Sequence, residues 1–184
     1  MNFYSIECSG SKKDFVITQE GKSDELREIR KYLKSPADEN KPPFKIEYIV
    51  ADDIVADDIK NTVAVPALQT VGFSEKFYEL YHEKMKDIFQ FVECTLWLND
   101  KSNSWNFYVV RFCHQSDFYN RDATRQYQKN HGSRTHIYNK SGLNFEYAAH
   151  DIKRPYFTFT ENFYKWMRKD RNGIVMGKKE VLVL

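Results

Sequence analysis

The chain has little of what marks fibrous, low-complexity, disulfide-bonded or membrane-spanning proteins. Its 184 residues include only 7 glycines and 5 prolines, too few for a collagen-like or low-complexity chain. The three cysteines, Cys8, Cys94 and Cys113, are odd in number and show no CxxC spacing, so we expect neither a disulfide framework nor a zinc site. No apolar run approaches the roughly 18 residues that a membrane-spanning helix needs. We therefore expect a soluble globular protein.

A strong excess of one charge sign is also missing. The chain has 28 Lys and Arg against 26 Asp and Glu, and this net charge of +2 is too balanced to indicate a dedicated nucleic-acid-binding protein. The N-terminal segment Met1–Glu7 has neither the basic head nor the apolar stretch of a secretory signal. A reducing cytoplasm is therefore the expected compartment.

Aromatic residues, by contrast, are abundant. The chain contains 14 Phe, 12 Tyr and 3 Trp, which together make up 16% of its residues. This apolar surface is enough to build a packed core, so wholesale disorder is excluded. Aromatic side chains are also typical anchors of protein–protein interfaces, so composition alone leaves both uses open.

Hydrophobic periodicity predicts an α+β fold, with a mainly antiparallel sheet and two or three amphipathic helices packed against it. Helices are expected from Ser23 to about Leu33, after the cap residue Ser74 and after the cap residue Thr160. The apolar face expected for the second helix consists of Phe77, Leu80, Tyr81, Met85 and Ile88. The expected strands are Met1–Cys8, Asp14–Thr18, Phe44–Val50, Phe89–Leu98, Trp105–Phe112, Phe145–Ala149, Tyr156–Phe159 and Val181–Leu184.

Two segments divide this pattern. The loop Ser35–Pro43 holds three prolines and is the expected boundary between an N-terminal strand and helix subdomain, residues 1–43, and a main domain, residues 44–184. Residues 113–142 are polar and irregular, which is typical of a surface insertion. Between the two strands of residues 89–112, the turn-forming residues 99–104 predict a β-hairpin.

Two local repeats stand out. Phe73–Leu80 aligns with Phe159–Trp166, since each has an aromatic residue, a hydroxyl cap, a glutamate, a spacer and then Phe-Tyr. The alignment predicts two similar strand–helix–strand units. A tandem pentapeptide, Val-Ala-Asp-Asp-Ile, occupies residues 50–54 and 55–59, and five is neither a helix period nor a strand period. Its four carboxylates, Asp52, Asp53, Asp57 and Asp58, form a solvated face, a binding patch or a metal site, although a hard-cation loop would need glycine and more widely spaced oxygens.

The order of these elements resembles the immunity proteins of bacterial polymorphic toxin systems, one family of which was first catalogued as a domain of unknown function. The resemblance covers roughly residues 44–184 and includes Pro66, Ser74, Glu75, Phe77, Leu80, Asp117, Glu161, Phe163 and Gly173. It implies a cytoplasmic protein without enzymatic activity, metal or cofactor that occludes the active site of a cognate toxin. Asp52, Asp53, Asp57 and Asp58 are the expected toxin-facing residues, because many toxins are basic nucleases. A homodimer stays open, and no membrane partner is expected.

The sequence is also compatible with two other classes of function, a nuclease and a nucleic-acid-binding protein. His131 and His136, with Arg134 between them, suggest a small metal-dependent nuclease, although histidines five residues apart do not share a helix face. Alternating basic and aromatic residues suit single-stranded nucleic acid, because stacking and phosphate contacts act together. This second set consists of Arg121, Arg125, Lys129, Arg134 and Lys140 with Tyr119, Tyr127 and Tyr138.

Overall fold

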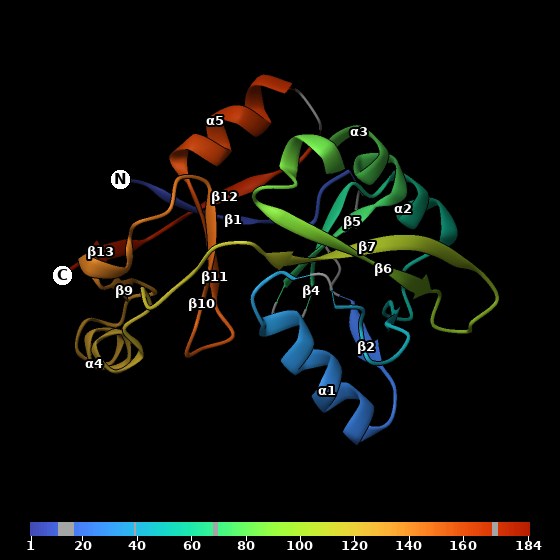
Figure 1. Ribbon diagram of the computed structural model, residues 1–184, viewed down its shortest axis with the longest axis horizontal. Helices are drawn as coiled ribbons and strands as arrows, with labels where there is room; N and C mark the ends of the chain where they lie inside the picture. The colour runs from blue at the N-terminus through green and yellow to red at the C-terminus, as the bar shows by residue number, and fades with distance from the viewer. Residues whose placement is uncertain (11–16, 39, 68–69, 171–172) are drawn as a thin grey trace.

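The computed structural model describes residues 1–10, 17–38, 40–67, 70–170 and 173–184 (Figure 1). The helices are α1 (Ser23–Lys34), α2 (Ala56–Asn61), α3 (Glu75–Met85), α4 (Arg121–His131), α5 (Glu161–Asp170) and the 3-10 turn η1 (Lys140–Gly142). The strands are β1 (Phe3–Ile6), β2 (Thr18–Glu20), β3 (Glu47–Ile49), β4 (Ala64–Ala67), β5 (Thr70–Ser74), β6 (Phe89–Trp97), β7 (Ser104–Phe112), β8 (Gln115–Ser116), β9 (His136–Tyr138), β10 (Ala148–Asp151), β11 (Phe157–Thr160), β12 (Met176–Lys179) and β13 (Val181–Val183).

The predicted α+β class is confirmed. In the described part of the chain, the strands form a six-stranded sheet in the order β2-β3-β6-β7-β5-β4, a five-stranded sheet in the order β12-β1-β11-β10-β8 and a two-stranded sheet of β13 and β9. Most neighbouring strands are antiparallel. The expected hairpin is β6 and β7, paired without interruption from Phe89↔Phe112 to Trp97↔Ser104. The strand expected over residues 14–18 falls mostly outside the described residues.

Two units of the same topology build most of the two large sheets. In the first unit, α3 connects β5 to β6, and β7 lies between these strands and antiparallel to both. In the second unit, α5 connects β11 to β12, and β1 takes the middle place in the same way. A further antiparallel strand lies beside the first strand of each unit, β4 beside β5 and β10 beside β11. The expected strand–helix–strand pair is thus present, with a third strand inserted in each copy.

The two helices begin with the same cap. Ser74 Oγ accepts a hydrogen bond from the Phe77 N–H at 3.4 Å, and Thr160 Oγ1 accepts one from the Phe163 N–H at the same distance. Each bond satisfies one of the backbone donors that the first turn of a helix leaves without a partner. The strand therefore ends and the helix begins at the residue that the sequence pattern predicts.

The inserted strands β7 and β1 carry the same tripeptide, Asn-Phe-Tyr, at residues 106–108 and 2–4. In both units the asparagine Nδ2 donates to the first glutamate of the helix, at 3.0 Å to Glu75 and 3.3 Å to Glu161. In both units the tyrosine ring also stacks on a tyrosine of the helix, with centroids 3.9 Å apart in the first unit and 4.4 Å apart in the second. The same local contacts therefore hold the middle strand against the helix twice.

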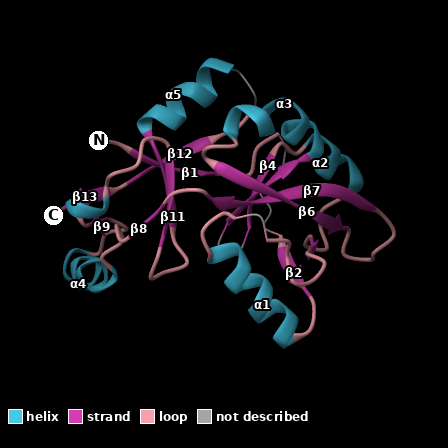
Figure 2. Ribbon diagram, viewed as in Figure 1, coloured by secondary structure: helices cyan, strands magenta, loops and turns pink. Residues whose placement is uncertain are grey.

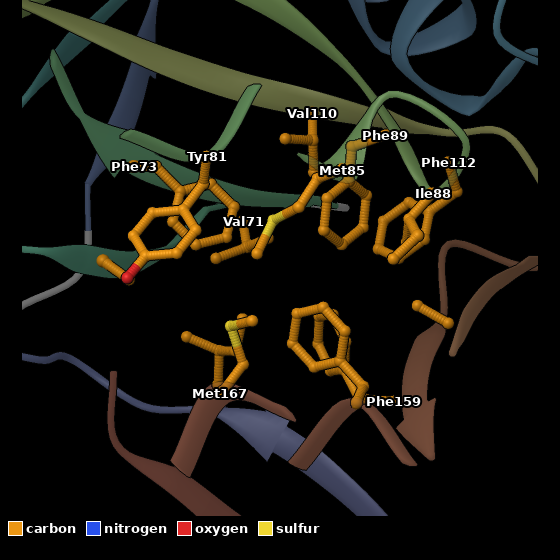
Figure 3. Close-up of a cluster of buried hydrophobic side chains, with 14 of the residues drawn as sticks. Val71, Phe73, Tyr81, Met85, Ile88, Phe89, Val110, Phe112, Phe159 and Met167 are labelled. Carbon is orange, nitrogen blue, oxygen red and sulfur yellow. The ribbon is translucent and has the colours of Figure 1, made fainter. Parts of the chain in front are cut away.

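The two units face each other across one hydrophobic core (Figure 3). Phe73 and Phe89 of the first unit lie opposite Phe159 and Phe163 of the second, and all four side chains are buried. The rings of Phe89 and Phe163 meet edge to face, with centroids 5.9 Å apart, which is the geometry that aromatic pairs prefer. Leu80, which was expected on the apolar face of α3, is instead 58% exposed, because Phe77, Tyr81 and Met85 turn toward this core.

A second core lies on the opposite face of the six-stranded sheet, under α1 (Figure 2). Ile29 and Leu33 of α1 pack there with Tyr48 and Leu96 of the sheet. Segments from both sides of residue 43 therefore share this core. Strand β1 likewise pairs with β11 and β12 near the C-terminus. The domain division at residue 43 stays a prediction of the sequence.

The segment of residues 113–142 is not the irregular insertion that its polar composition predicted. It contains β8, the helix α4, β9 and η1. Asn120 caps α4 by accepting a hydrogen bond from the Ala123 N–H at 3.1 Å. Only Thr124 of α4 is buried, so the helix lacks the apolar stripe by which a sequence reveals an amphipathic helix. Phe118 and Tyr138 from this segment belong to a third, smaller core.

Candidate protein-binding groove

A groove with a volume of about 610 Å³ runs between residues 40–46 and the first half of β6. One wall is the segment that leads from α1 to β3, with Lys41 and Phe44 exposed to solvent and Pro42 half-buried. Phe91 and Glu93 of β6 lie on the other side. The groove combines exposed apolar surface with charges at its rim, which is the composition of protein-binding surfaces.

The edge of β6 that faces this groove has free pairing capacity. Strand β7 pairs with all nine residues of β6, whereas β3 pairs only with Thr95–Trp97. Thr95 N donates to Ile46 O at 3.0 Å, so the odd-numbered residues of β6 direct their backbone groups to the β3 side. By strand alternation, the N–H and C=O groups of Phe91 and Glu93 point to the same edge. No described strand pairs with them there.

Two prolines precede β3, where the chain departs from this edge. If the chain continued backward from β3 in the same register, Pro43 and Phe44 would lie beside Phe91 and Val92. In that register the N–H groups facing Phe91 and Glu93 would be those of Phe44 and Ile46, and the Pro43 nitrogen would face away from β6. Pro42 and Pro43 fix their own φ and restrict the residue before each, and the chain leaves the edge of β6 before it reaches Phe91.

The buried side chain of Arg111 in β7 binds Ser35, Pro36 and Asp38, which precede the groove wall in the chain. Its side chain has no exposed surface, and its Nη1 donates to Asp38 Oδ1 at 2.7 Å and to Gln90 Oε1 at 2.8 Å. Its Nη2 donates to Ser35 Oγ at 2.6 Å and to the Pro36 carbonyl. These bonds compensate the guanidinium group for its loss of water.

The same guanidinium group determines the environment of two further side chains at the groove. It lies 4.1 Å from the ring centroid of Tyr32, which is a cation–π contact. Its hydrogen bond also lowers the pKa of the Asp38 carboxyl, so this group stays ionised to more acidic pH than an ordinary aspartate. Two of the side chains that Arg111 contacts also bond the first residue of the wall: Tyr32 Oη donates to the Asn40 carbonyl at 2.9 Å, and Asn40 Nδ2 donates to Asp38 Oδ2 at 2.7 Å.

The four aspartates proposed from the sequence lie elsewhere, after β3 and in α2. Asp52, Asp53 and Asp57 are exposed, and Asp58 is half-buried. Asp58 Oδ2 accepts a hydrogen bond from the Val55 N–H at 3.3 Å and so caps α2, while Asp57 pairs with Lys60 at 3.7 Å. Among the described residues no group of three or more His, Cys, Asp or Glu side chains is placed to hold a metal ion.

The tandem pentapeptide adopts two conformations. Its first copy forms a turn after β3 and its second copy forms α2. In both copies the final isoleucine is buried, Ile54 at 5% and Ile59 at 4% exposure. The repeat therefore supplies two apolar anchors to the core under α1, and it leaves most of its carboxylates in solvent.

The histidines and tyrosines that suggested nuclease or nucleic-acid chemistry have contacts within the protein. His131 Nδ1 lies 3.0 Å from the Tyr127 carbonyl at the end of α4. His136 is half-buried on β9, where burial and the nearby Lys179 lower its pKa. Tyr138 is buried, and Tyr119 stacks on another tyrosine at 4.2 Å. Tyr127 stacks on His131, with centroids 4.1 Å apart, so all three tyrosines expected to stack on bases are engaged with the protein itself.

Comparison with known proteins adds no relative. No protein-family model, curated protein or solved structure matches the chain. Among the described helices, none has both the length and the apolar character of a membrane span.

Sequence reasoning did not find this groove or Arg111. The available signal was the single charge in the apolar run Tyr-Val-Val-Arg-Phe at residues 108–112. A charged residue in such a strand is rarely buried without a partner, so it indicates a specific interaction. Its main partners, Ser35 and Asp38, lie more than 70 residues earlier, where local patterns give no indication of contact.

Proposed function

We propose that this protein is a cytoplasmic immunity protein that neutralises a cognate bacterial toxin by binding it and covering its active site. The observation that carries the proposal is the groove along β6, where an unpaired strand edge lies beside exposed apolar side chains. Such an edge offers directional hydrogen bonds, and the exposed ring of Phe44 offers an anchor. The order of elements, which resembles immunity proteins, supports the same function.

Three exposed aspartates give the proposed complex a second contact surface. The three exposed aspartates Asp52, Asp53 and Asp57 lie beyond the opposite end of β3 from the groove wall. Exposed carboxylates of this kind accelerate encounter with a basic partner and add less to its final affinity. Replacing these three residues by asparagine is therefore expected to slow association at low salt. Asp58 is left unchanged in that variant, because it caps α2.

Co-expression with the polypeptide encoded by the adjacent gene tests the proposal. A strain that expresses this polypeptide alone is expected to stop growing, and a strain that also expresses the present chain is expected to grow normally. A matched control is the variant Lys41→Glu combined with Phe44→Asp, which places two negative charges on the groove wall and leaves its buried residues intact. Toxicity that persists in the presence of the wild-type chain would contradict the proposal.

A further inference from the structure

In the part of the chain that the structure describes, no strand pairs with β6 at Phe91 and Glu93, and this edge indicates how the partner is held. Phe91 and Glu93 together present two N–H donors and two carbonyl acceptors to the groove, in the alternating spacing of a strand. The Thr95–Ile46 bond shows that the same edge already accepts a strand two residues beyond Glu93. A strand placed in the groove beside Phe91 and Glu93 would therefore extend the hydrogen-bonded ladder that β3 forms with β6.

We propose that an extended segment of the toxin enters this groove and adds as a strand to the free edge of β6. The inference rests on the proposed function and specifies its binding mode. Main-chain hydrogen bonds to Phe91 and Glu93 supply the register, and alternate side chains of the segment meet the groove wall. The start of the wall is tied at Asn40 to Tyr32 and Asp38, both of which Arg111 contacts, and this reduces the ordering cost of the complex.

The chemistry of the wall determines which segment fits. Pro42 and Phe44 present apolar surface, and Lys41 places an exposed positive charge at the rim. Glu93 is exposed on the strand itself and repels an acidic residue directly opposite. The segment is therefore extended and mainly apolar, with an acidic side chain on the side of Lys41 and none opposite Glu93.

A second copy of this chain does not fit as the occupant. The free edge of β6 lies behind the wall of residues 40–46, so a strand must enter the groove to reach it. In a second copy the same wall stands in front of the same edge. Edge-to-edge pairing of two β6 strands would bring the two walls, and the two exposed Lys41 side chains on them, to the same side of the new ladder. A single segment from a different protein meets no such obstacle.

A pair of variants at residue 93 tests this binding mode. Glu93→Pro removes an N–H that points into the groove and does not pair with β7, so proline leaves the β6–β7 ladder intact. Glu93→Thr keeps the N–H and removes the same charge. We expect Glu93→Pro to bind the adjacent-gene polypeptide at least tenfold more weakly than Glu93→Thr does, because both variants lack the charge and only the proline variant lacks the N–H. Titration calorimetry measures both.

Amide hydrogen exchange on the wild-type complex gives the second measurement, which does not depend on how the proline variant folds. The Phe91 and Glu93 amides are expected to become protected on binding, whereas in the free protein they exchange faster than the Val92 amide. If the wild-type chain binds the polypeptide but both amides stay unprotected, strand addition is wrong and the proposed function stands. If the wild-type chain does not bind the polypeptide at all, the proposed function is wrong as well.

Discussion

The two units make the same contacts from different chain orders. In the first unit the middle strand β7 follows β6 through a short hairpin, whereas in the second unit the middle strand β1 comes from the other end of the chain. Cap, glutamate, asparagine and stacked tyrosines nevertheless recur in both. This architecture is therefore determined by local contacts between strand and helix, and it tolerates a change in how the strands are connected.

The units differ at their outer edges. In the first unit β3 covers the end of β6 and leaves the groove beside Phe91 and Glu93. In the second unit β12 is the edge strand of its sheet, and no described strand covers it. The equivalent parts hold the core, and the part that differs carries the candidate binding site. This division is expected if the repeated contacts serve stability and the added segment of residues 40–46 serves binding.

The largest effect is expected from removing equivalent core rings. Phe73 and Phe159 occupy the same position in the two units, each with no exposed surface. Phe73→Ala and Phe159→Ala are each expected to lower the free energy of unfolding by about 3–5 kcal/mol, through lost burial and the cavity left behind. Urea unfolding measures both. A difference of more than about 2 kcal/mol between them would contradict the equivalence of the two units.

A smaller effect is expected where the units differ in charge. Lys179 in β12 pairs with Phe3, as Cys94 in β6 pairs with Phe107, so a lysine stands where the first unit has a buried thiol. Its Nζ donates to the Phe157 carbonyl at 2.8 Å and lies 4.3 Å from the centroid of an aromatic ring. Burial of the amine lowers its pKa to about 7, although the residue as a whole is half-buried.

This lowered pKa predicts how stability depends on pH. Between about pH 7 and the ordinary lysine value near 10, the unfolded chain binds more protons than the folded chain. The free energy of unfolding should therefore increase steadily from pH 7 to pH 9, by on the order of 1 kcal/mol per pH unit. Urea unfolding at several pH values checks the slope. Lys179→Met should flatten it, and Lys178→Met, at the exposed neighbouring residue, should leave it unchanged.

The smallest effect is expected at the helix caps. Ser74→Ala should cost about 1 kcal/mol of unfolding free energy, because it removes one cap hydrogen bond from a half-buried position. Thr160→Ala should cost more, roughly 1–2 kcal/mol, because the buried Thr160 hydroxyl also donates to the Glu146 carbonyl. Thermal unfolding ranks the two variants. The reverse order would show that the caps are not ordered by burial.

Much of this fold follows from local sequence patterns. The helix starts at Ser74 and Thr160 and the hairpin of residues 89–112 could be predicted, because caps, turn residues and alternating apolar residues act over short distances. The tripeptide Asn-Phe-Tyr at residues 2–4 and 106–108 was a further signal for the duplicated unit, and sequence reasoning missed it.

The elements that sequence reasoning missed depend on distant partners. Strand β12 reads Met-Gly-Lys-Lys, which contains few strand-forming residues, and it is held by its pairing with β1. Helix α4 is almost entirely polar, and its only buried residue, Thr124, is polar too. The groove depends on Arg111 binding Ser35 and Asp38 across the sheet. Local sequence patterns do not indicate which distant residues will meet, because these contacts form only when the chain packs into its tertiary structure. The four aspartates stay a prediction for the toxin-facing surface.

The central claim is that this protein acts by covering its partner and not by altering it. Titrating the purified chain into an activity assay of the adjacent-gene polypeptide, the proposed toxin, tests this claim most directly. Occlusion predicts that inhibition is complete at one chain per toxin molecule, does not deepen with time and is reversed when the complex is separated. Progressive loss of toxin activity at a small fraction of molar equivalence would contradict it, because that result requires turnover.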